Sequence, residues 1–391
     1  MQDLVALALT PSAMSRWLRR VWDDGHAVLP LAPDATRGEH ELTLERVRPA
    51  VLGRMAPDGQ VTFEQLGGAR AVPDGTALVV ATSGSTGRPR GVRLTHDAVT
   101  ASTEASVARL GCRPHQPWLA CLPTHHVAGL QTLLRSWAVD AEPVVHDAFD
   151  VTDVAPAPAA HVSLVPTQLW RLLDAGVDVS RFETILLGGA RAPASLLVRA
   201  RDAGARVVVS YGMTETCGGC VYDGRPLDGV QVDLDDRSRV RIRGSVLFSG
   251  YHEADGSVAA PLDAGGWFVT NDVGRLVDGR LEISGRADDV VISGGENVPL
   301  DAVVESLLTH PEVLDAATLG RDNDEWGEVV VAAVVPRDQD APPTLDELRR
   351  HVTAQRSPAF APREVTIVEA IPRGPLGKVP RAVLEGLLGE S

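Results

Sequence analysis

The sequence predicts an α/β fold in which a large N-terminal domain is followed by a smaller α+β C-terminal domain. The N-terminal domain is expected to hold mostly parallel sheets flanked by helices, together with a small β subdomain. Two observations lead to this prediction. Short β-branched runs alternate with longer amphipathic stretches, and near residue 230 the pattern changes to short strands with Gly and Asp turns. The length of 391 residues suits roughly two or three domains.

The N-terminal domain shows the alternation most clearly. Strands are expected at the β-branched runs 77–81, 184–187 and 206–209. Helices are expected at the amphipathic stretches 96–110, 129–139, 167–175 and 194–203. The Ala-Pro-Ala-Pro run within 151–160 predicts a loop, because proline cannot donate a backbone hydrogen bond.

The small subdomain is expected between Val230 and Ile283, as an antiparallel or barrel-like group of strands. In the tail that follows Gly285, the pattern predicts helices at 300–309 and 345–354 and strands near 316–319, 329–335 and 365–368. The predicted domains are therefore residues 1–285 and residues 286–391.

The composition restricts the class of partner. The chain carries 37 basic and 52 acidic residues, a formal net charge of −15, and 44% of its residues are hydrophobic. Such an acidic protein repels phosphate backbones and anionic lipid surfaces, so we expect neither nucleic-acid nor membrane-surface binding. Lys378 is the only lysine, and every other basic residue is an arginine.

The N-terminus and the cysteines point to a reducing compartment. The apolar run Leu4–Leu9 has no basic residues before it and is too short for a signal peptide or a membrane span. Four cysteines are too few for a disulfide scaffold of this length. Together with the missing signal, this predicts a cytoplasmic protein. Cys217 and Cys220 have C-x-x-C spacing, but no second pair follows to complete a structural zinc site, so we expect buried or incidental thiols.

A glycine-rich loop follows the strand predicted at 77–81. Its glycines allow tight turns with inward N–H groups, and its hydroxyls and arginines can donate to a polyphosphate. The candidate phosphate-binding residues are Thr82, Ser83, Gly84, Ser85, Thr86, Gly87 and Arg90. The loop lacks the Lys-Ser/Thr ending of a Walker A motif. Taken alone, it could equally be an exposed turn.

Several further motifs occur in order along the chain. They are the segments 122–129, 187–190, 210–215, 266–272, 285–289, 293–297 and 372–378. Together with the loop, they resemble the adenylate-forming superfamily of acyl-CoA synthetases, luciferases and peptide-synthetase adenylation domains. The resemblance runs from about residue 77 to the end of the chain. Arg90 stands where that superfamily commonly has lysine, and it keeps the positive charge.

The resemblance implies two half-reactions. A carboxylate and ATP give an acyl-adenylate and pyrophosphate, and a thiol, usually that of CoA, then displaces AMP. Tyr211 and Gly212 would lie at the adenine, Thr214 would bind the α-phosphate, and Glu215 would hold Mg²⁺, a cation that prefers oxygen ligands. The backbone of Gly188, Gly189 and Ala190 would lie close to the adenine plane. Gly189 would also lie close to the acyl substrate. Outside this context, Tyr-Gly-x-Thr-Glu would more often be a turn with a surface carboxylate.

The resemblance assigns further residues to the nucleotide and the acyl group. Asp272 would accept hydrogen bonds from the ribose hydroxyls, and Arg286 would reach the ribose or a phosphate. His126 would close the acyl-carboxylate pocket, although the neighbouring His125 leaves the choice between the two open. Outside these motifs, each would be a turn residue, a solvated arginine or a packed histidine.

The C-terminal domain would rotate between the two half-reactions. By resemblance, Lys378 bridges the attacking carboxylate and the α-phosphate, Asp288 is the hinge, and Ser293–Asn297 enters the site for the thiol step. Keeping the single lysine at this position suggests a need for a compact ammonium group.

The acyl substrate is indicated by three features. The segment 163–173 is similar to o-succinylbenzoate-CoA ligases of menaquinone biosynthesis, and the region before the loop, only 81 residues, resembles their short members. That substrate keeps a second carboxylate, for which Arg135 in the apolar stretch 129–139 is the candidate partner. Alternatively, Arg135 snorkels from a helix edge. Another free-standing acyl- or aryl-CoA ligase, or an inactive ligand-binding relative, remains the alternative function.

Overall fold

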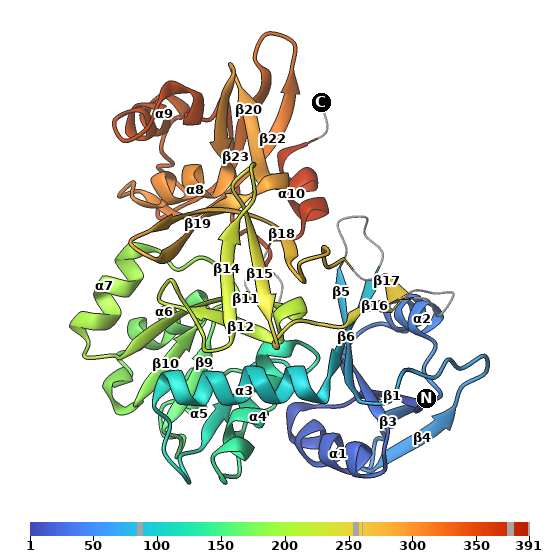
Figure 1. Ribbon diagram of the computed structural model, residues 1–391. Coiled ribbons are helices and arrows are strands. Elements are labelled where there is room, and N and C mark those ends of the chain that lie inside the picture. Colours follow the sequence, from blue (N-terminus) through green and yellow to red (C-terminus); the bar gives the residue numbers. More distant parts are fainter. Residues whose placement is uncertain (84–88, 253–257, 260, 374–378, 390–391) are drawn as a thin grey trace. The chain divides into compact units, whose positions relative to one another are not determined.

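A computed structural model describes residues 1–83, 89–252, 258–259, 261–373 and 379–389 (Figure 1). The chain forms two compact units. The first contains residues 1–232 and 242–268, and the second contains residues 233–241 and 269–391. Each unit is described by itself below.

The first unit contains an eight-stranded mixed sheet with the order β17-β16-β6-β5-β2-β1-β3-β4. Its strands are β1 (Leu4–Ala8), β2 (Ala27–Leu31), β3 (Val51–Met55), β4 (Val61–Gln65), β5 (Thr76–Ser83), β6 (Pro89–Thr95), β16 (Gly250–His252) and β17 (Val258–Ala259). Strands β1, β2, β3 and β5 pair in parallel, whereas β6 and β16 are antiparallel to their neighbours. The sheet is thus parallel at its centre and antiparallel toward its edges.

Strand β1 is buried on both faces, as central parallel strands are. Leu7 packs with Met14 and Leu18 of helix α1 (Pro11–Asp23), whereas Leu4 and Ala6 pack with Val47, the last residue of helix α2 (Arg37–Val47). Helices therefore cover both faces, and alternate residues of one strand serve two cores.

A seven-stranded sheet in the same unit has the order β13-β12-β11-β10-β9-β7-β8. Its strands are β7 (Trp118–Ala120), β8 (Val144–Val145), β9 (His161–Leu164), β10 (Thr184–Leu187), β11 (Val207–Met213), β12 (Gly218–Tyr222) and β13 (Arg225–Pro226). Helices α5 (Val151–Val154), α6 (Pro166–Asp174) and α7 (Ala194–Asp202) belong to this part of the chain, and residues of all three share one core with the sheet. The strands from β8 to β11 are parallel.

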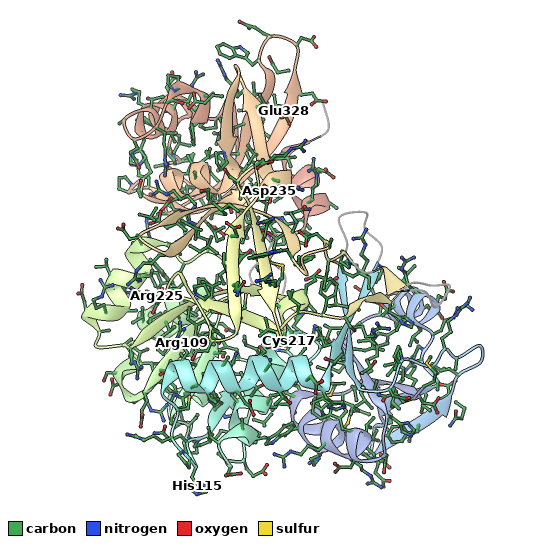
Figure 2. All side chains as sticks on the ribbon, in the orientation of Figure 1. Arg109, His115, Cys217, Arg225, Asp235 and Glu328 are labelled. Carbon is green, nitrogen blue, oxygen red and sulfur yellow. The ribbon has the colours of Figure 1, made fainter. Side chains whose placement is uncertain are left out.

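Helices α3 (His96–Leu110) and α4 (Val127–Ala138) lie between the two sheets. Both contact strand β12, and α3 also contacts β5 and β6. Arg109, near the end of α3, donates to the backbone carbonyls of Arg225 and Pro226 (Figure 2). The end of this helix is thereby fixed to strand β13.

The second unit begins with most of a four-stranded sheet, in the order β14-β15-β18-β19. These strands are β14 (Val230–Leu234), β15 (Arg239–Gly244), β18 (Phe268–Val277) and β19 (Arg280–Arg286). The C-terminal part has the strands β20 (Val290–Ser293), β21 (Glu296–Pro299), β22 (Val313–Asn323), β23 (Gly327–Pro336) and β24 (Glu364–Ile367) and the helices α8 (Leu300–Leu308), α9 (Leu345–Thr353) and α10 (Arg381–Leu388). These C-terminal strands form their own sheet, in the order β21-β20-β23-β22 with β24 paired to β23. Leu307 of α8 and Leu348 of α9 pack together in the hydrophobic core of this C-terminal sheet.

The helices predicted at 96–110, 129–139, 167–175, 194–203, 300–309 and 345–354 are confirmed to within two residues at each end. The β subdomain expected between Val230 and Ile283 is present as the four-stranded sheet β14-β15-β18-β19. Strands β16 and β17, from the same stretch of chain, instead join the eight-stranded sheet through β6. Helix α5 lies in the first residues of the stretch expected to be a loop, and the Ala-Pro-Ala-Pro run itself is a loop. Packing divides the chain at residue 268. The predicted domain boundary at residue 285 marks where a rotating C-terminal domain would begin, and it stays a prediction.

Candidate functional site

Three of the phosphate-binding candidates, Thr82, Ser83 and Arg90, lie on the paired strands β5 and β6. Strands β5 and β6 are antiparallel, with Thr82 opposite Arg90 and Ser83 opposite Pro89. The candidates Gly84, Ser85, Thr86 and Gly87 lie outside the described residues. Helix α3 begins only at His96, after the whole of β6. The loop therefore returns into a strand, unlike a Walker A loop, which leads directly into a helix.

Glu215 is held by a tyrosine from a distant strand. The Tyr251 hydroxyl donates to Glu215 Oε1 at 2.9 Å, and the Phe248 backbone N–H donates to the Glu215 carbonyl at 2.8 Å. The Arg90 guanidinium lies over the Tyr251 ring, 5.4 Å from its centroid. Burial, with Glu215 beside the hydroxyl, raises the pKa of Tyr251, so this group remains a neutral donor. The structure thus brings Arg90, Tyr251 and Glu215 together.

Sequence reasoning missed Tyr251. The chain has only three tyrosines. The Tyr251 hydroxyl donates to Glu215, and the Tyr222 hydroxyl is bonded to Arg135 and Ser106. Scarcity of this residue type was the available signal.

The backbone around Glu215 is sharply bent. Thr214–Thr216 form a 3-10 turn, and Cys217, which follows it, has a left-handed φ of 54°. A Cβ atom on Gly212 would lie 2.0 Å from the Gly218 carbonyl oxygen, so Gly212 allows this close approach. Thr214 and Glu215 are half-buried, whereas a free surface turn would expose both.

The adenine candidates meet at the carboxyl edge of the seven-stranded sheet. Strands β10 and β11 are parallel neighbours, with Leu187 opposite Val209. Gly188, Gly189 and Ala190 follow β10 directly, and Tyr211 lies near the end of β11. Gly189 has a left-handed φ of 80°. Ligands commonly bind at this edge of a parallel sheet.

Both histidines of the segment 122–129 are half-buried. His126 is the N-cap residue of α4, and the centroids of the His125 and His126 rings lie 4.3 Å apart. Burial lowers the pKa of His125, which favours the neutral ring. A Cβ on Gly129 would lie 2.3 Å from the Pro123 carbonyl oxygen, so a glycine is needed where the chain turns into α4. The choice between the two histidines stays open.

Arg135 is buried, with 3% of its surface exposed, so the alternative of snorkelling from a helix edge is wrong. Its Nε donates to Ser106 Oγ at 2.8 Å, its Nη1 to Ser163 Oγ at 3.3 Å and its Nη2 to the Tyr222 hydroxyl at 3.4 Å. The guanidinium carbon lies 5.0 Å from the centroid of the Trp118 ring. Within the described ranges, no carboxylate lies within ion-pair distance of this cation.

His161 lies beside this cluster. Its ring stacks on Trp118 with centroids 5.0 Å apart, and burial lowers its pKa to about 4. A neutral ring at this position leaves Arg135 as the cation of the cluster.

In the second unit, Asp272 and Arg286 lie opposite each other on β18 and β19. Arg286 Nη1 is 3.6 Å from Asp272 Oδ1, and its Nε is 3.8 Å from Asp289 Oδ2. Asp272 is the more buried, with 13% of its side chain exposed compared with 46% for Arg286. The sheet thus holds an arginine and a carboxylate together, as ribose and phosphate recognition would require.

The segment Ser293–Asn297 forms the turn of the β20–β21 hairpin. Ser293 pairs with Glu296, and both central residues, Gly294 and Gly295, have positive φ, at 59° and 82°. Two-residue hairpin turns of this kind require such glycines. Asp288 lies in a 3-10 turn, Ala287–Asp289, between β19 and β20. Lys378 lies outside the described residues.

The remaining metal and thiol expectations concern Cys217 (Figure 2) and Cys220. Both are fully buried free thiols, and burial raises the pKa of the Cys220 thiol to about 12. No group of three or more His, Cys, Asp and Glu side chains suited to a metal occurs in the described part of the chain. Cys217 is part of a hydrophobic core cluster of the first unit. Among the described helices, none is long and apolar enough to cross a membrane.

Comparison with known proteins tests the family. Residues 18–251 match the AMP-binding enzyme family, and residues 303–378 match the C-terminal domain of AMP-binding enzymes. This chain belongs to the AMP-binding enzyme family. The match begins at residue 18, before residue 77, where the resemblance carried by the motifs begins.

The relatives point to one kind of ligase. A probable 2-succinylbenzoate–CoA ligase of Mycobacterium tuberculosis is 42% identical over 328 residues, which cover 80% of this chain and 85% of the relative. The 2-succinylbenzoate–CoA ligase of Escherichia coli is 32% identical over 346 residues, covering 83% and 75%.

Solved structures agree with the relatives. The o-succinylbenzoate CoA synthetase of Bacillus subtilis, in complex with the acyl-adenylate intermediate OSB-AMP, superposes with a TM-score of 0.84 at 26% identity and covers 98% of this chain and 88% of that one. The same enzyme with ATP and magnesium ion gives a TM-score of 0.85, also at 26% identity, covering 97% and 88%.

Proposed function

We propose that this chain is an ATP-dependent acid–CoA ligase that converts 2-succinylbenzoate into its CoA thioester, a step of menaquinone biosynthesis. A carboxylate oxygen of the substrate attacks the α-phosphorus of ATP and pyrophosphate leaves. The CoA thiolate then attacks the acyl carbon and AMP leaves. Membership of the AMP-binding enzyme family and the named relatives support this chemistry.

Arg135 is the observation that carries the choice of substrate. A guanidinium has five N–H groups, and three of them donate to the hydroxyls of Ser106, Ser163 and Tyr222. In the described part of the chain, one N–H on each terminal nitrogen is left over, which is the arrangement that a carboxylate accepts in a bidentate pair.

A buried cation surrounded only by neutral groups is costly unless a counter-charge joins it. 2-Succinylbenzoate keeps one carboxylate after the other reacts, so it brings that counter-charge. Fatty acids and benzoate do not. His126, the N-cap residue of α4, would lie at the reacting carboxylate, on the same helix as Arg135.

The nucleotide would be bound by residues of several of the sequence motifs. Glu215 fits a magnesium ion, because its carboxylate is half-buried and held in place by Tyr251. The ion, when bound, neutralises phosphate charge. Arg90, Thr82 and the loop 83–87 would donate to the phosphates, as would Thr214. Tyr211, Gly212 and Gly188–Ala190 would flank the adenine, and Asp272 and Arg286 would bind the ribose.

The tail after Gly285 would serve both half-reactions in turn. Lys378 would orient the carboxylate and the α-phosphate for the first, with a compact charge aimed at the reacting atoms. Rotation at Asp288 would then withdraw it and bring the β20–β21 turn to the site for the thiol step. Gly294 and Gly295 leave this turn without side chains at its centre, which would suit the lining of a thiol channel.

We place the enzyme in the cytoplasm. All four thiols are unpaired, in agreement with a reducing compartment, and ATP and CoA are both available there.

An ATP–pyrophosphate exchange assay across a panel of carboxylates tests the proposal. 2-Succinylbenzoate should give by far the highest kcat/KM, compared with benzoate, fatty acids and amino acids. A higher kcat/KM for benzoate or a fatty acid would refute the substrate. No exchange with any carboxylate would indicate an inactive relative.

A further inference from the structure

A closed ring of hydrogen bonds joins one edge of the Arg135 guanidinium to two side chains from other elements, Ser106 and Tyr222. Arg135 Nε donates to Ser106 Oγ at 2.8 Å, Ser106 Oγ and the Tyr222 hydroxyl share a hydrogen bond of 2.7 Å, and Arg135 Nη2 donates to the Tyr222 hydroxyl at 3.4 Å. Ser106 lies on α3, Arg135 on α4 and Tyr222 on β12. All three are at least 97% buried.

The ring holds the guanidinium by one edge and leaves part of its opposite side to other partners. Ser106 and Tyr222 engage Nε and Nη2, so the guanidinium cannot rotate about its last bond without breaking two hydrogen bonds. Ser163 occupies one N–H of Nη1. The Trp118 ring, 5.0 Å from the guanidinium carbon, adds a flat apolar neighbour. The remaining N–H of Nη1 and that of Nη2 are therefore fixed in direction.

Tyr222 has little freedom of its own. Its side chain is 2% exposed, and a Cβ built on Gly219 would lie 2.8 Å from its Cε1 atom, so the ring is packed directly against the backbone of its own strand. A rigid phenol and a helix-borne serine hold an arginine that would otherwise have many rotamers. Both hydroxyls are neutral, so they orient the cation without supplying its counter-charge.

We infer that Tyr222 and Ser106 are positioning residues that set the enzyme's preference for a substrate with a second carboxylate. They act through Arg135, whose pre-aimed N–H groups bind that carboxylate, and they do not touch the reacting atoms. The inference rests on the proposed function. It goes further by assigning selectivity to two residues that carry no charge and belong to none of the sequence motifs.

The test compares Tyr222→Phe with the wild-type enzyme on three acids. These are 2-succinylbenzoate and two analogues that each lack one carboxylate, 4-oxo-4-phenylbutanoate and 2-propanoylbenzoate. Loss of one hydrogen bond to a charged group should lower kcat/KM for 2-succinylbenzoate about tenfold, mainly through KM. For whichever analogue the wild type adenylates, kcat/KM should change less than about twofold, because that acid has no carboxylate for Arg135.

A second variant keeps the test decisive if Tyr222→Phe folds poorly. Ser106→Ala opens the same ring from α3 and should lower the preference for the diacid similarly. The double variant should lose little more than either single variant, because both changes break one ring. Thr132→Val is the matched control. It removes a buried hydroxyl from α4 that bonds only the Gly129 carbonyl, and it should leave the preference unchanged.

The outcomes separate the two proposals. If the wild type does not adenylate 2-succinylbenzoate, the proposed function fails and the inference fails with it. If the wild type does, but both variants keep its preference or lose activity equally on diacid and analogue, only the inference is overturned. A preference that falls about tenfold in both variants and stays constant in Thr132→Val supports it.

Discussion

Replacing Tyr251 with Phe should raise the KM for magnesium–ATP about tenfold and leave the KM for the carboxylate unchanged. The substitution keeps the ring that packs on Phe248, with centroids 4.9 Å apart, and removes only the hydroxyl that donates to Glu215 at 2.9 Å. A hydrogen bond to a charged group contributes about 1.5–3 kcal/mol. Because the side chains of Tyr251 and Glu215 are only half-buried, we take the low end of this range, about 1.5 kcal/mol, which corresponds to roughly tenfold in KM.

The assay is ATP–pyrophosphate exchange with the magnesium and ATP concentrations varied separately. The free magnesium concentration that gives half-maximal rate should rise together with the KM for ATP, since Glu215 would be less well oriented. The raised pKa of Tyr251 keeps its hydroxyl protonated, so the difference between the variant and the wild type should be constant from about pH 6 to 9.

Tyr222→Phe is the matched control, because it removes a buried tyrosine hydroxyl on the Arg135 ring instead. It should leave the magnesium and ATP dependence unchanged. A magnesium requirement that stays within about twofold of wild type in Tyr251→Phe, or that moves equally in Tyr222→Phe, would refute the argument that Tyr251 orients Glu215.

Four further predictions follow from the site. Arg135→Ala should lower kcat/KM for 2-succinylbenzoate in the pyrophosphate-exchange assay, by an amount equivalent to about 2–5 kcal/mol of activation free energy. A change in kcat/KM within twofold would exclude Arg135 as the carboxylate partner. Lys378→Ala should slow adenylation by about 10²–10³-fold but still convert preformed acyl-adenylate and CoA to thioester at near the wild-type rate; an equal loss in both steps would contradict its role. Asp288→Pro should slow thioester formation much more than adenylation in single-turnover experiments, because proline fixes φ at the hinge, and equal slowing would argue against a hinge there. The pKa of His161 is lowered to about 4 in the folded protein, so the unfolded state binds a proton first as the pH falls from 6.5 toward 4. The free energy of unfolding should therefore decrease over that window, by up to about 3 kcal/mol from this group. In urea titrations His161→Phe should lose less free energy of unfolding over the same window than the wild type, and an equal loss in both proteins would show that His161 is not responsible.

The sequence alone predicts the local elements and the motifs of the family. The periodicity of 96–110 and 345–354 predicted helices that the structure contains with nearly the same bounds, because an amphipathic pattern is repeated over several turns within one segment. Arg135 stood out for the same reason: a charge in an apolar helical stretch breaks a local pattern. The motif around Glu215 was recognisable since its residues are adjacent in the chain.

The partners of these residues become visible only in the folded chain. Ser106 and Tyr222 are 116 positions apart, Arg135 and Tyr222 are 87 apart, and Glu215 and Tyr251 are 36 apart. A lone serine on a helix or a lone tyrosine on a short strand has no periodic or spacing signal, so nothing local marks it as a hydrogen-bond partner. The same holds for β16, three residues whose place in the first sheet depends on pairing with β6. Such contacts exist only after the sheets and the helices between them have packed, because packing places side chains from distant segments within hydrogen-bond distance.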